Sequence, residues 1–228
     1  MIEMTNVSKK YMRQTALHDI SLTLPQGKVI GVVGENGGGK STLLKLICGL
    51  SQPTSGRVTV DGEIAHRRIS RVVSYLSELD AFYNIFTVRE VMDFQASQFK
   101  DFNLAKALDI MGFMQLEPHM RIKDLSKGNR ARLKIILTLA REVPYIVMDE
   151  PLSGLDPMVR KSILKGMISY VNLDFQTLIL TTHEITEVES LLDGFIALKN
   201  GSLLKMADLD ELHESEGMGI ADWMRKYY

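Results

Sequence analysis

The sequence has little cysteine, little net charge and no long apolar run, and each shortage excludes something. One cysteine, Cys48, rules out a disulfide within the chain, and its apolar neighbours favour a buried thiol in a reducing compartment. The 27 lysine and arginine residues are balanced by 28 aspartate and glutamate residues, so no basic excess points to nucleic acid. Apolar runs such as 145–148 are far shorter than the roughly 18 residues that a membrane span needs. We therefore expect no nucleic-acid partner, and a role at a membrane only through another protein.

The 228 residues also lack a linker and an internal repeat. The first residues, 1–4, do not have the basic and then apolar pattern of a signal peptide. A chain of this length can bury one sizeable core or two small ones. We expect a single domain that spans residues 1–228.

Short apolar runs alternate with segments of helical periodicity. Residues 28–33 are a β-branched run typical of a buried strand, and residues 41–50 carry leucine and isoleucine at helical spacing. Further strands are expected at 17–24, 57–60, 69–76, 145–148 and 177–181. Residues 88–139 have mostly helical spacing and indicate a helical subdomain inserted at about 79–140. This order predicts an α/β fold with a largely parallel sheet.

A glycine-rich loop lies between the run 28–33 and the helix that follows it. Residues 34–41 read Gly-Glu-Asn-Gly-Gly-Gly-Lys-Ser and match the phosphate-loop pattern G-x-x-x-x-G-K-[ST] throughout. In such a loop backbone N–H groups point at phosphate oxygens, the lysine neutralises the β- and γ-phosphates, and the hydroxyl ligates Mg²⁺. We expect these roles for Lys40 and Ser41, with a further hydrogen bond from Thr42. The other residues expected around the phosphates are Gly34, Asn36, Gly37, Gly38 and Gly39.

Two carboxylates end the apolar run 145–148. Asp149 and Glu150 resemble the Walker B element, in which the aspartate holds Mg²⁺ and the adjacent glutamate polarises the attacking water as a general base. Such a pair by itself is commonly the solvated start of a loop. Together with the phosphate loop it predicts a site that hydrolyses a nucleotide.

Further motifs give the sequence a specific resemblance. Residues 125–129, Leu-Ser-Lys-Gly-Asn, resemble the Leu-Ser-Gly-Gly-Gln signature of ATP-binding-cassette (ABC) proteins, and residues 153–156 match their D-loop. His183 follows the next strand, where the family has its switch histidine, and Tyr11 stands where the family stacks an aromatic ring on adenine. The motifs occur in the family order over nearly the whole chain. The chain thus resembles an ABC nucleotide-binding domain.

This resemblance implies a fold, cofactors and a partner. The implied fold is the P-loop NTPase fold of ABC ATPases, with an antiparallel β-subdomain in the N-terminal part, and the implied cofactors are ATP and Mg²⁺. Each ATP is expected between the phosphate loop of one subunit and the signature of a second nucleotide-binding domain. Ser126 and Gly128 would then face the γ-phosphate from the start of a helix, and His183 would contact it from its own subunit.

Simpler interpretations exist for several of these residues. Ser126 alone fits an ordinary helix N-cap, and Asp156 before Pro157 is a good N-cap followed by a proline at the first helical position. A D-loop role for Asp156 at the nucleotide is compatible with that arrangement. Tyr11 also fits a surface tyrosine, and a lone histidine such as His183 is usually structural.

The sequence departs from the family at three positions. Glu78 stands where the family has a glutamine that ligates Mg²⁺ and orients water. A glutamate is a stronger ligand for a hard cation, but it adds negative charge beside a triphosphate. We expect Glu78 to sense Mg²⁺, and the alternative is that it faces the membrane partner. Lys127 and Asn129 replace a glycine and a glutamine of the signature, and solvent exposure is the simpler interpretation for a lysine.

The motifs imply a Mg²⁺-dependent ATPase subunit that powers a transporter. The membrane subunit would be a separate multi-span permease, and the ATPase would lie in the cytoplasm on the inner face of the cell membrane. Short chains with such a signature resemble the ATPases of bacterial ABC-2-type efflux systems, which favours export of a drug, peptide or lipid. One alternative is an ATPase switch that regulates a cell-envelope machine. Another is a binding module without hydrolysis, and the intact Lys40, Asp149, Glu150 and His183 argue against it.

Two segments have open interpretations. The apolar stretch Leu79, Phe82, Tyr83, Ile85 and Phe86 fits a docking site for the membrane partner, and it fits burial inside the helical subdomain nearly as well. The tail, residues 208–228, is too short for a regulatory domain, which favours packing on the core.

Overall fold

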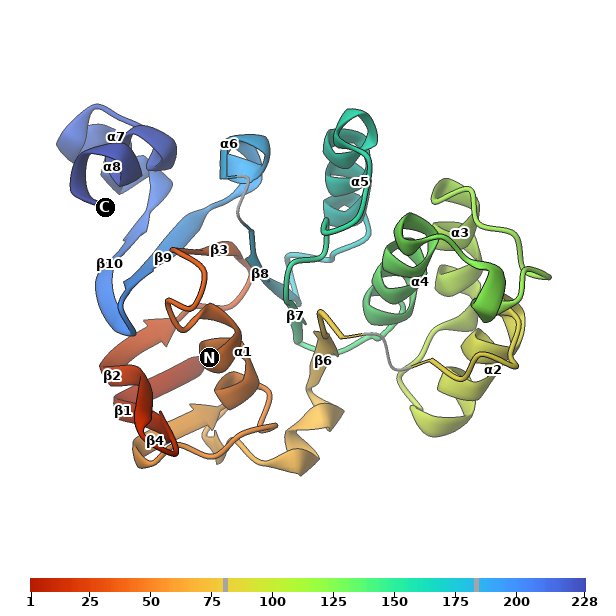
Figure 1. Ribbon diagram of the computed structural model, residues 1–228, viewed down its shortest axis with the longest axis horizontal. Coiled ribbons are helices and arrows are strands. Elements are labelled where there is room, and N and C mark those ends of the chain that lie inside the picture. Colours follow the sequence, from red (N-terminus) through yellow and green to blue (C-terminus); the bar gives the residue numbers. More distant parts are fainter. Residues whose placement is uncertain (80–81, 183–184) are drawn as a thin grey trace.

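Two β-sheets and a block of helices make up the structure, a computed structural model that describes residues 1–79, 82–182 and 185–228 (Figure 1). Over these residues the larger sheet has the strand order β10-β9-β3-β8-β7-β6. The strands from β9 to β6 are parallel, and β10 is antiparallel to β9. Their bounds are β3 Val29–Val33, β6 Val73–Leu76, β7 Tyr145–Met148, β8 Thr177–Thr181, β9 Gly194–Lys199 and β10 Ser202–Asp208. The largely parallel core sheet predicted from the sequence is confirmed.

An antiparallel sheet is built from the N-terminal part of the chain. Its strand order is β2-β1-β4-β5, with β1 at Ile2–Tyr11, β2 at Gln14–Leu24, β4 at Ser55–Val60 and β5 at Glu63–Ile64. Buried side chains of this sheet, such as Ile20, share one hydrophobic cluster with Ile30 of β3 and Leu43 of helix α1 (Lys40–Ile47). The loop between β3 and α1 is therefore anchored in packed elements at both ends.

In the described part of the segment between β6 and β7, three α-helices form the helical subdomain. They are α2 (Val88–Gln98), α3 (Leu104–Phe113) and α4 (Lys127–Leu139). Figure 1 places them beyond the β6 end of the core sheet, away from the antiparallel sheet. A capping box starts α2, because Thr87 Oγ1 accepts a hydrogen bond from the Glu90 N–H at 3.2 Å and the Glu90 carboxylate accepts one from the Thr87 N–H at 2.7 Å. Helix α5 (Pro157–Ser169) follows β7.

Several boundaries differ from the sequence prediction, and the strands expected at 17–24 and 57–60 start earlier, at Gln14 and Ser55. Residues 69–76 are predicted as one strand, but the structure has a 3₁₀ helix at Arg67–Arg71 and a strand only from Val73. His66 caps this helix by accepting a hydrogen bond from the Arg68 N–H at 3.1 Å, and the helical turn buries Ile69. Helix α1 ends at Ile47 rather than at residue 50, because Gly49 adopts a left-handed φ of 64°.

The elements after β8 are largely not predicted from the sequence. Besides β9 and β10 they include α6 (Ile185–Val188), α7 (Leu209–Glu216) and α8 (Ile220–Tyr227). Figure 1 shows α7 and α8 together at the β10 edge of the core sheet. The Trp223 ring of α8 lies against Phe195 of β9, with ring centroids 5.6 Å apart. The tail thus packs on the core, as expected from the sequence.

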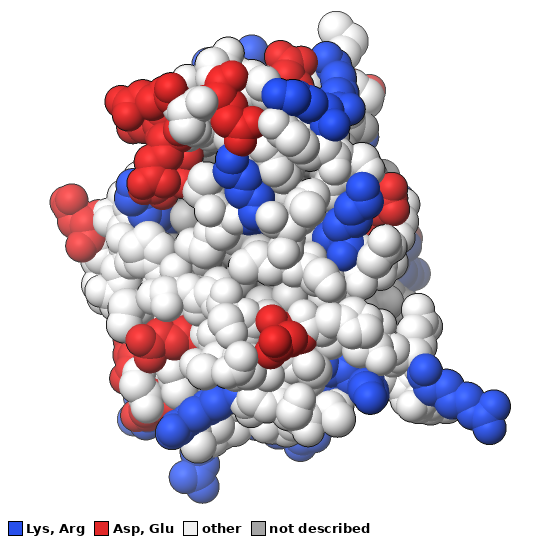
Figure 2. All heavy atoms as spheres, turned by 90° about the vertical axis from the view of Figure 1, so that its left-hand side faces the viewer, with Lys and Arg blue, Asp and Glu red and all other residues white. Residues whose placement is uncertain are grey.

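The face that carries β10, α7 and α8 has mixed charge. Figure 2 shows acidic side chains gathered toward the top of this face, with basic side chains beside them and a largely uncharged band below. Over its described residues this face presents no continuous basic surface. No helix in the described part of the chain is both long and apolar enough to cross a membrane.

Candidate functional site

The glycine-rich loop connects the buried strand β3 to helix α1. Gly39 is the N-cap of α1 with a φ of 103°, and a Cβ atom there would lie 2.7 Å from the Ala16 carbonyl oxygen of β2. Only glycine fits this conformation and this close approach. Gly38 is buried like Gly39, whereas Asn36 and Gly37 are exposed at the loop tip. Because α1 starts directly after Gly39, its free N–H groups and positive dipole end meet the loop, which gives the loop the form of an anion cradle.

Lys40 lies inside this loop with 7% of its surface exposed. Its Nζ donates hydrogen bonds to the carbonyl oxygens of Gly34 at 2.7 Å and Glu35 at 3.0 Å. Burial lowers the pKa of the Lys40 ammonium, and the negative charges of Glu150 and Asp149 oppose that effect. An anion bound in the loop would also favour the charged form of Lys40.

Asp149 is the centre of a hydrogen-bond network beside the loop. It follows β7 directly and is 2% exposed, and its Oδ1 accepts hydrogen bonds from Ser41 Oγ at 3.0 Å and from Thr181 Oγ1 at 2.9 Å. Its Oδ2 accepts one from the Tyr75 hydroxyl at 3.3 Å. The fold therefore brings Ser41 and Asp149 into contact across 108 residues of sequence. Thr42 shares the first turn of α1 with Ser41.

The oxygens of Ser41 and Asp149 fit a magnesium ion. Mg²⁺ prefers hard oxygen ligands and is usually held by one or two protein side chains together with phosphate oxygens and water. A hydroxyl and a carboxylate in contact beside an anion cradle supply such a pair. Burial and the Asp149 charge raise the pKa of the neighbouring Tyr75 hydroxyl, so Tyr75 remains a neutral donor to Asp149.

Glu150 has a strained backbone conformation. Its φ of 49° lies in the left-handed region, which costs a non-glycine residue about 1–3 kcal/mol. Its N–H donates to Thr181 Oγ1 at 2.8 Å, so the hydroxyl that contacts Asp149 also fixes the Glu150 backbone. Strain of this kind is common where a reacting group must be held in a set position.

Glu150 lines a cavity of about 280 Å³ together with Glu78, Lys127 and Lys134. Lys134 of α4 donates hydrogen bonds from Nζ to the carbonyl oxygens of Ser77 at 3.1 Å and Glu78 at 2.9 Å. These bonds tie the loop after β6 to α4. Glu78 and Lys127, two of the positions at which the chain departs from the ABC pattern, thus line one cavity and carry opposite charges.

Ser126 and Asp156 cap the helices that follow them. Ser126 Oγ accepts a hydrogen bond from the Asn129 N–H at 3.2 Å at the start of α4. Asp156 Oδ1 accepts one from the Met158 N–H at 2.8 Å at the start of α5, where Pro157 is the first helical residue. Both N-caps expected from the sequence are confirmed.

The signature and the D-loop lie close to each other. A Cβ atom at Gly128 would lie 3.3 Å from the Gly154 carbonyl oxygen, and one at Gly154 would lie 2.9 Å from Lys127 Cγ. The Lys127 stem therefore packs over the D-loop. Ser126 is exposed at the N-terminal end of α4, where the helix dipole favours an anion.

Tyr11 lies apart from the hydrogen-bond network of Asp149. Tyr11 ends β1 with 44% of its surface exposed, the Lys9 ammonium 4.8 Å from its ring centre and the Ser51 Oγ 3.4 Å from its hydroxyl. An accessible ring fits both a surface tyrosine and a stacking platform. His183 lies outside the described residues, and Thr182 before it is buried.

Three residues of the site are not singled out by the sequence motifs. Thr181 is the last residue of a predicted strand. Because neighbouring parallel strands bring their carboxyl ends together, this position indicates a place close to Asp149. Lys134 lies seven residues after Lys127, on the same face of α4. Tyr75 has no such signal, because its contact with Asp149 depends on the pairing of β6 with β7.

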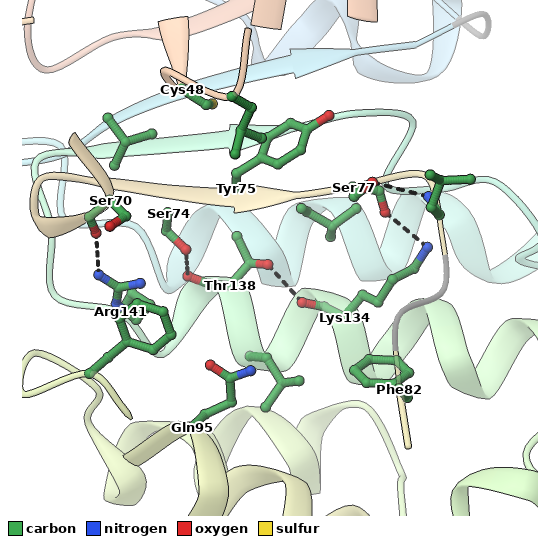
Figure 3. A pocket seen from close by; sticks show the side chains of 16 residues that line it. Cys48, Ser70, Ser74, Tyr75, Ser77, Phe82, Gln95, Lys134, Thr138 and Arg141 are labelled. Carbon is green, nitrogen blue, oxygen red and sulfur yellow. Dashed lines mark hydrogen bonds between the residues drawn. The ribbon is translucent and has the colours of Figure 1, made fainter. Parts of the chain in front are cut away.

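A second cavity, of about 360 Å³, lies between the core and the helical subdomain (Figure 3). Figure 3 shows strand β6 with Tyr75 on one side of it and Gln95, Lys134 and Arg141 on the other. The Arg141 guanidinium donates to the Ser70 carbonyl oxygen at 2.7 Å, pairs with the Asp101 carboxylate and stacks over the Phe99 ring at 3.8 Å. Arg141 thus connects the two sides of this cavity, which we call the groove.

Part of the apolar stretch after Glu78 is exposed to solvent, and part is packed against the core. Leu79, Tyr83 and Ile85 are largely exposed, while Phe82 and Phe86 are partly buried against the core. Leu79 and Phe82 line the groove, together with the exposed Leu50. The two interpretations of this stretch, an exposed docking surface and burial in the subdomain, therefore each describe part of it.

The family of this chain follows from comparison with known proteins. The model of the ABC transporter family matches residues 17–153, more than half of the chain. The chain belongs to this family, and it has the ABC ATPase fold. A solved ATP-binding subunit of an ABC transporter superposes with a TM-score of 0.87 at 24% identity, over 100% of this chain and 99% of that one. A dimeric bacterial ABC transporter cassette superposes with a TM-score of 0.82 at 25% identity, over 92% and 99%.

Several curated relatives are about 30% identical to this chain over most of its length. The ABC transporter ATP-binding protein YtrB of Bacillus subtilis is 30% identical over 216 residues, which cover 94% of this chain and 74% of YtrB. The bacitracin transport ATP-binding protein BcrA of Enterococcus faecalis is 30% identical over 221 residues, covering 94% and 71%. The Nod factor export ATP-binding protein I of Rhizobium johnstonii is 32% identical over 208 residues, covering 88% and 67%.

Proposed function

We propose that this chain is the Mg²⁺-dependent ATPase subunit of an ABC transporter and that residues 1–228 form one nucleotide-binding domain. The observation that carries the proposal is the contact of Ser41 with Asp149 between the Lys40 loop and the strained Glu150. An anion cradle, a pair of hard oxygen ligands and a fixed carboxylate meet there. This combination suits hydrolysis of a nucleoside triphosphate.

The residues of this site have separate roles in the proposed reaction. Lys40 and the loop N–H groups bind the β- and γ-phosphates, and Ser41 and Asp149 would hold Mg²⁺, which would supply positive charge to neutralise those phosphates. Glu150 orients the attacking water and accepts its proton as a general base. His183 contacts the γ-phosphate. Further contacts to the nucleotide come from Tyr11 on adenine and from the loop residues Gly34, Asn36, Gly37, Gly38, Gly39 and Thr42.

The other half of each site belongs, in this proposal, to a second copy of the chain or a closely related chain. Ser126 and Gly128 bind the γ-phosphate held by the opposite domain, and Asp156 lies at the same interface. The exposed N-terminal end of α4 supports this arrangement, as does the dimeric form of the cassette that superposes with a TM-score of 0.82.

Glu78 senses Mg²⁺ in this proposal. Its place at the edge of the cavity that Glu150 lines supports the idea, because a carboxylate there is close to the reacting groups. The positive charges of Lys127 and Lys134 on the same cavity offset the negative charge that Glu78 adds.

Transport follows from the family, and the groove is the proposed contact with a multi-span membrane permease. Leu50 and Leu79 are exposed apolar residues that line the groove. Tyr83 and Ile85 are exposed in the apolar stretch after Glu78, so a cytoplasmic segment of the permease can cover this surface. The chain then lies at the cytoplasmic face of the membrane. The name of one relative, the Nod factor export ATP-binding protein I, supports an exporter, although the petrobactin import ATP-binding protein YclP of Bacillus subtilis is 28% identical. The alternative remains an ATPase switch of a cell-envelope machine.

The test of the ATPase proposal compares Glu150→Gln with Glu142→Gln in a Mg²⁺-dependent ATPase assay. We expect kcat to fall at least about 100-fold in Glu150→Gln, because the general base is lost. Glu142→Gln is the matched control, since the Glu142 carboxylate accepts a hydrogen bond from Asn103 on an exposed surface. Size exclusion in ATP should trap Glu150→Gln as a dimer. A wild type that neither binds nor hydrolyses ATP, alone or with its membrane subunit, would overturn the proposal.

A further inference from the structure

Tyr228, the residue after α8, contacts the first residues of the phosphate loop. Its hydroxyl accepts a hydrogen bond from the Glu35 N–H at 3.0 Å and donates one to the Leu198 carbonyl oxygen of β9. A Cβ atom at Gly34 would lie 2.8 Å from this hydroxyl and 2.3 Å from the Leu198 carbonyl oxygen. Glycine at the first loop position therefore lets β9 and Tyr228 close on the loop.

The carbonyl oxygen of Glu35 is held by other residues of the phosphate loop. Its carbonyl oxygen accepts hydrogen bonds from Lys40 Nζ and from the Gly38 N–H, each at 3.0 Å. The Tyr228 hydroxyl and the Lys40 ammonium are thus linked through one loop residue. Tyr228 uses none of the N–H groups at the start of α1, which are the groups that an anion in the loop would need.

Tyr228 is itself held by a packed helix. The Trp223 ring of α8 lies against Phe195 of β9, and its Nε1 donates to the Glu216 carboxylate at 3.1 Å. The Ile220 N–H at the start of α8 donates to the Glu189 carboxylate. These contacts fix α8 on the core sheet, so the Tyr228 hydroxyl has a defined position.

We propose that Tyr228 is a positioning residue for nucleotide binding, through its hydrogen bond to the Glu35 backbone. The bond keeps the start of the loop, and with it Lys40, in the geometry that receives the triphosphate. This inference rests on the proposed ATPase function. It gives the tail a role that its length and composition do not suggest.

The experiment compares Tyr228→Phe with Tyr227→Phe in the full chain. Tyr228→Phe removes only the hydroxyl, and Tyr227→Phe makes the same chemical change one residue away, on an exposed ring that stacks on Trp223 with centroids 5.2 Å apart. The Kd for Mg·ATP is measured by displacement of a fluorescent ATP analogue, and kcat and KM by steady-state ATPase. We expect Tyr228→Phe to raise Kd and KM about 3- to 10-fold, the range of one neutral hydrogen bond, with kcat within about 2-fold. Tyr227→Phe should match the wild type.

Urea unfolding of both variants separates positioning from simple packing. A lower stability of Tyr228→Phe with an unchanged Kd would mean that the hydroxyl is only structural, and it would overturn the inference. Tighter ATP binding by Tyr228→Phe would overturn it too, because the contact would then oppose nucleotide binding. A wild type that binds no nucleotide would instead refute the ATPase proposal on which the inference depends.

Discussion

One threonine hydroxyl connects the two acidic residues of the site. Thr181 Oγ1 donates to Asp149 at 2.9 Å and accepts from the Glu150 N–H at 2.8 Å. The first bond orients the proposed metal ligand, and the second holds the left-handed backbone of the proposed base. Because Thr181 is buried, water cannot replace it as a partner for either group.

Replacing Thr181 by valine therefore has two expected effects. Two buried polar groups lose a partner, which should lower the free energy of unfolding by about 1–3 kcal/mol. Misplacement of Asp149 and Glu150 should lower kcat at least about 10-fold. Thr177→Val is the matched control, since Thr177 Oγ1 accepts from the Gly27 N–H at 3.0 Å at the opposite end of the same strand. Urea unfolding and steady-state ATPase distinguish the two variants: a similar stability loss with normal kcat is expected only for Thr177→Val, and normal kcat in both would refute the idea.

Cys48 should make the protein less stable in alkali. Burial, and to a lesser extent the charge of Asp149, raises the pKa of the Cys48 thiol, so the folded state keeps a proton that the unfolded state releases above about pH 8.5. The free energy of unfolding should then fall as pH rises beyond that value, by up to about 1.4 kcal/mol per pH unit from this group.

Cys48→Ala supplies the comparison. Its absolute stability is expected to be lower because of lost packing, but its decline between about pH 8.5 and about pH 10 should be shallower than in the wild type. Equal slopes would mean that the thiol titrates normally in the folded state. Native Cys48 should also resist alkylation by a maleimide until the chain unfolds, because a buried neutral thiol is a poor nucleophile.

At the scale of single residues, the sequence predicts the site residues that belong to a motif of known chemistry. The spacing of Lys40 and Ser41, and the acid pair after a buried strand, depend only on local order. Tyr75 could not be found, because a tyrosine in a strand is most often a packing residue. Its hydroxyl reaches Asp149 only because β6 pairs with β7 in the observed register.

Helix α4 is the element that joins the signature to the loop of Glu78. Lys127, Ala131 and Lys134 follow one face of the helix and line the cavity that contains Glu78 and Glu150. A movement of α4 would therefore shift the Glu78 loop through the two hydrogen bonds from Lys134.

A double-mutant cycle at Glu78 and Lys127 measures how these charges act on Mg²⁺. Glu78→Gln removes a negative charge and should raise the Mg²⁺ concentration for half-maximal ATPase rate about 3-fold or more. Lys127→Met keeps the stem that packs over Gly154 but removes a competing positive charge, so it should lower that concentration. The double variant should lie near the wild type, and the differences should shrink at high salt because both side chains are exposed. An unchanged rate and Mg²⁺ dependence in Glu78→Gln would show that Glu78 does not sense the ion.

Strands could be predicted from the sequence where their apolar residues form a compact run. The strands at Val29–Val33, Tyr145–Met148 and Thr177–Thr181 are buried throughout and read as compact runs. Strand β10 is half exposed, with polar residues between the apolar ones, so it gives a weak pattern. The error at 69–76 has the same origin, since one buried isoleucine in a 3₁₀ turn resembles the start of a strand.

At the scale of the molecule, the phosphate-loop site lies where the two sheets meet. The antiparallel sheet anchors the phosphate loop and the core sheet supplies Asp149 and Glu150, whereas the signature of the helical subdomain is proposed to serve the site of a second domain. The order of motifs allowed this arrangement to be expected from the sequence. The groove beside β6 could not be expected from the sequence, because the residues that line it come from segments that meet only in the folded chain.

The groove leads to a prediction about coupling to the membrane subunit. Leu50 is an exposed apolar residue that lines the groove, and Ile85 is an exposed residue of the apolar stretch that also contains the groove residues Leu79 and Phe82. Leu50→Glu and Ile85→Glu place a charge where an apolar partner surface would have to cover it, at a cost of about 2 kcal/mol or more. Both variants should keep the basal ATPase rate of the isolated chain, because neither residue contacts the proposed nucleotide site.

Co-purification with the proposed membrane subunit is the measurement, together with the ATPase rate of the assembled complex. We expect at least about 30-fold weaker association for Leu50→Glu and Ile85→Glu, and loss of any stimulation by the membrane subunit. Met12→Glu is the control, because Met12 is a fully exposed apolar residue in the β1–β2 turn and does not line the groove. If Met12→Glu weakens the complex and neither Leu50→Glu nor Ile85→Glu does, the membrane subunit binds through the antiparallel sheet, and nucleotide-driven movement of α4 would need another route to it.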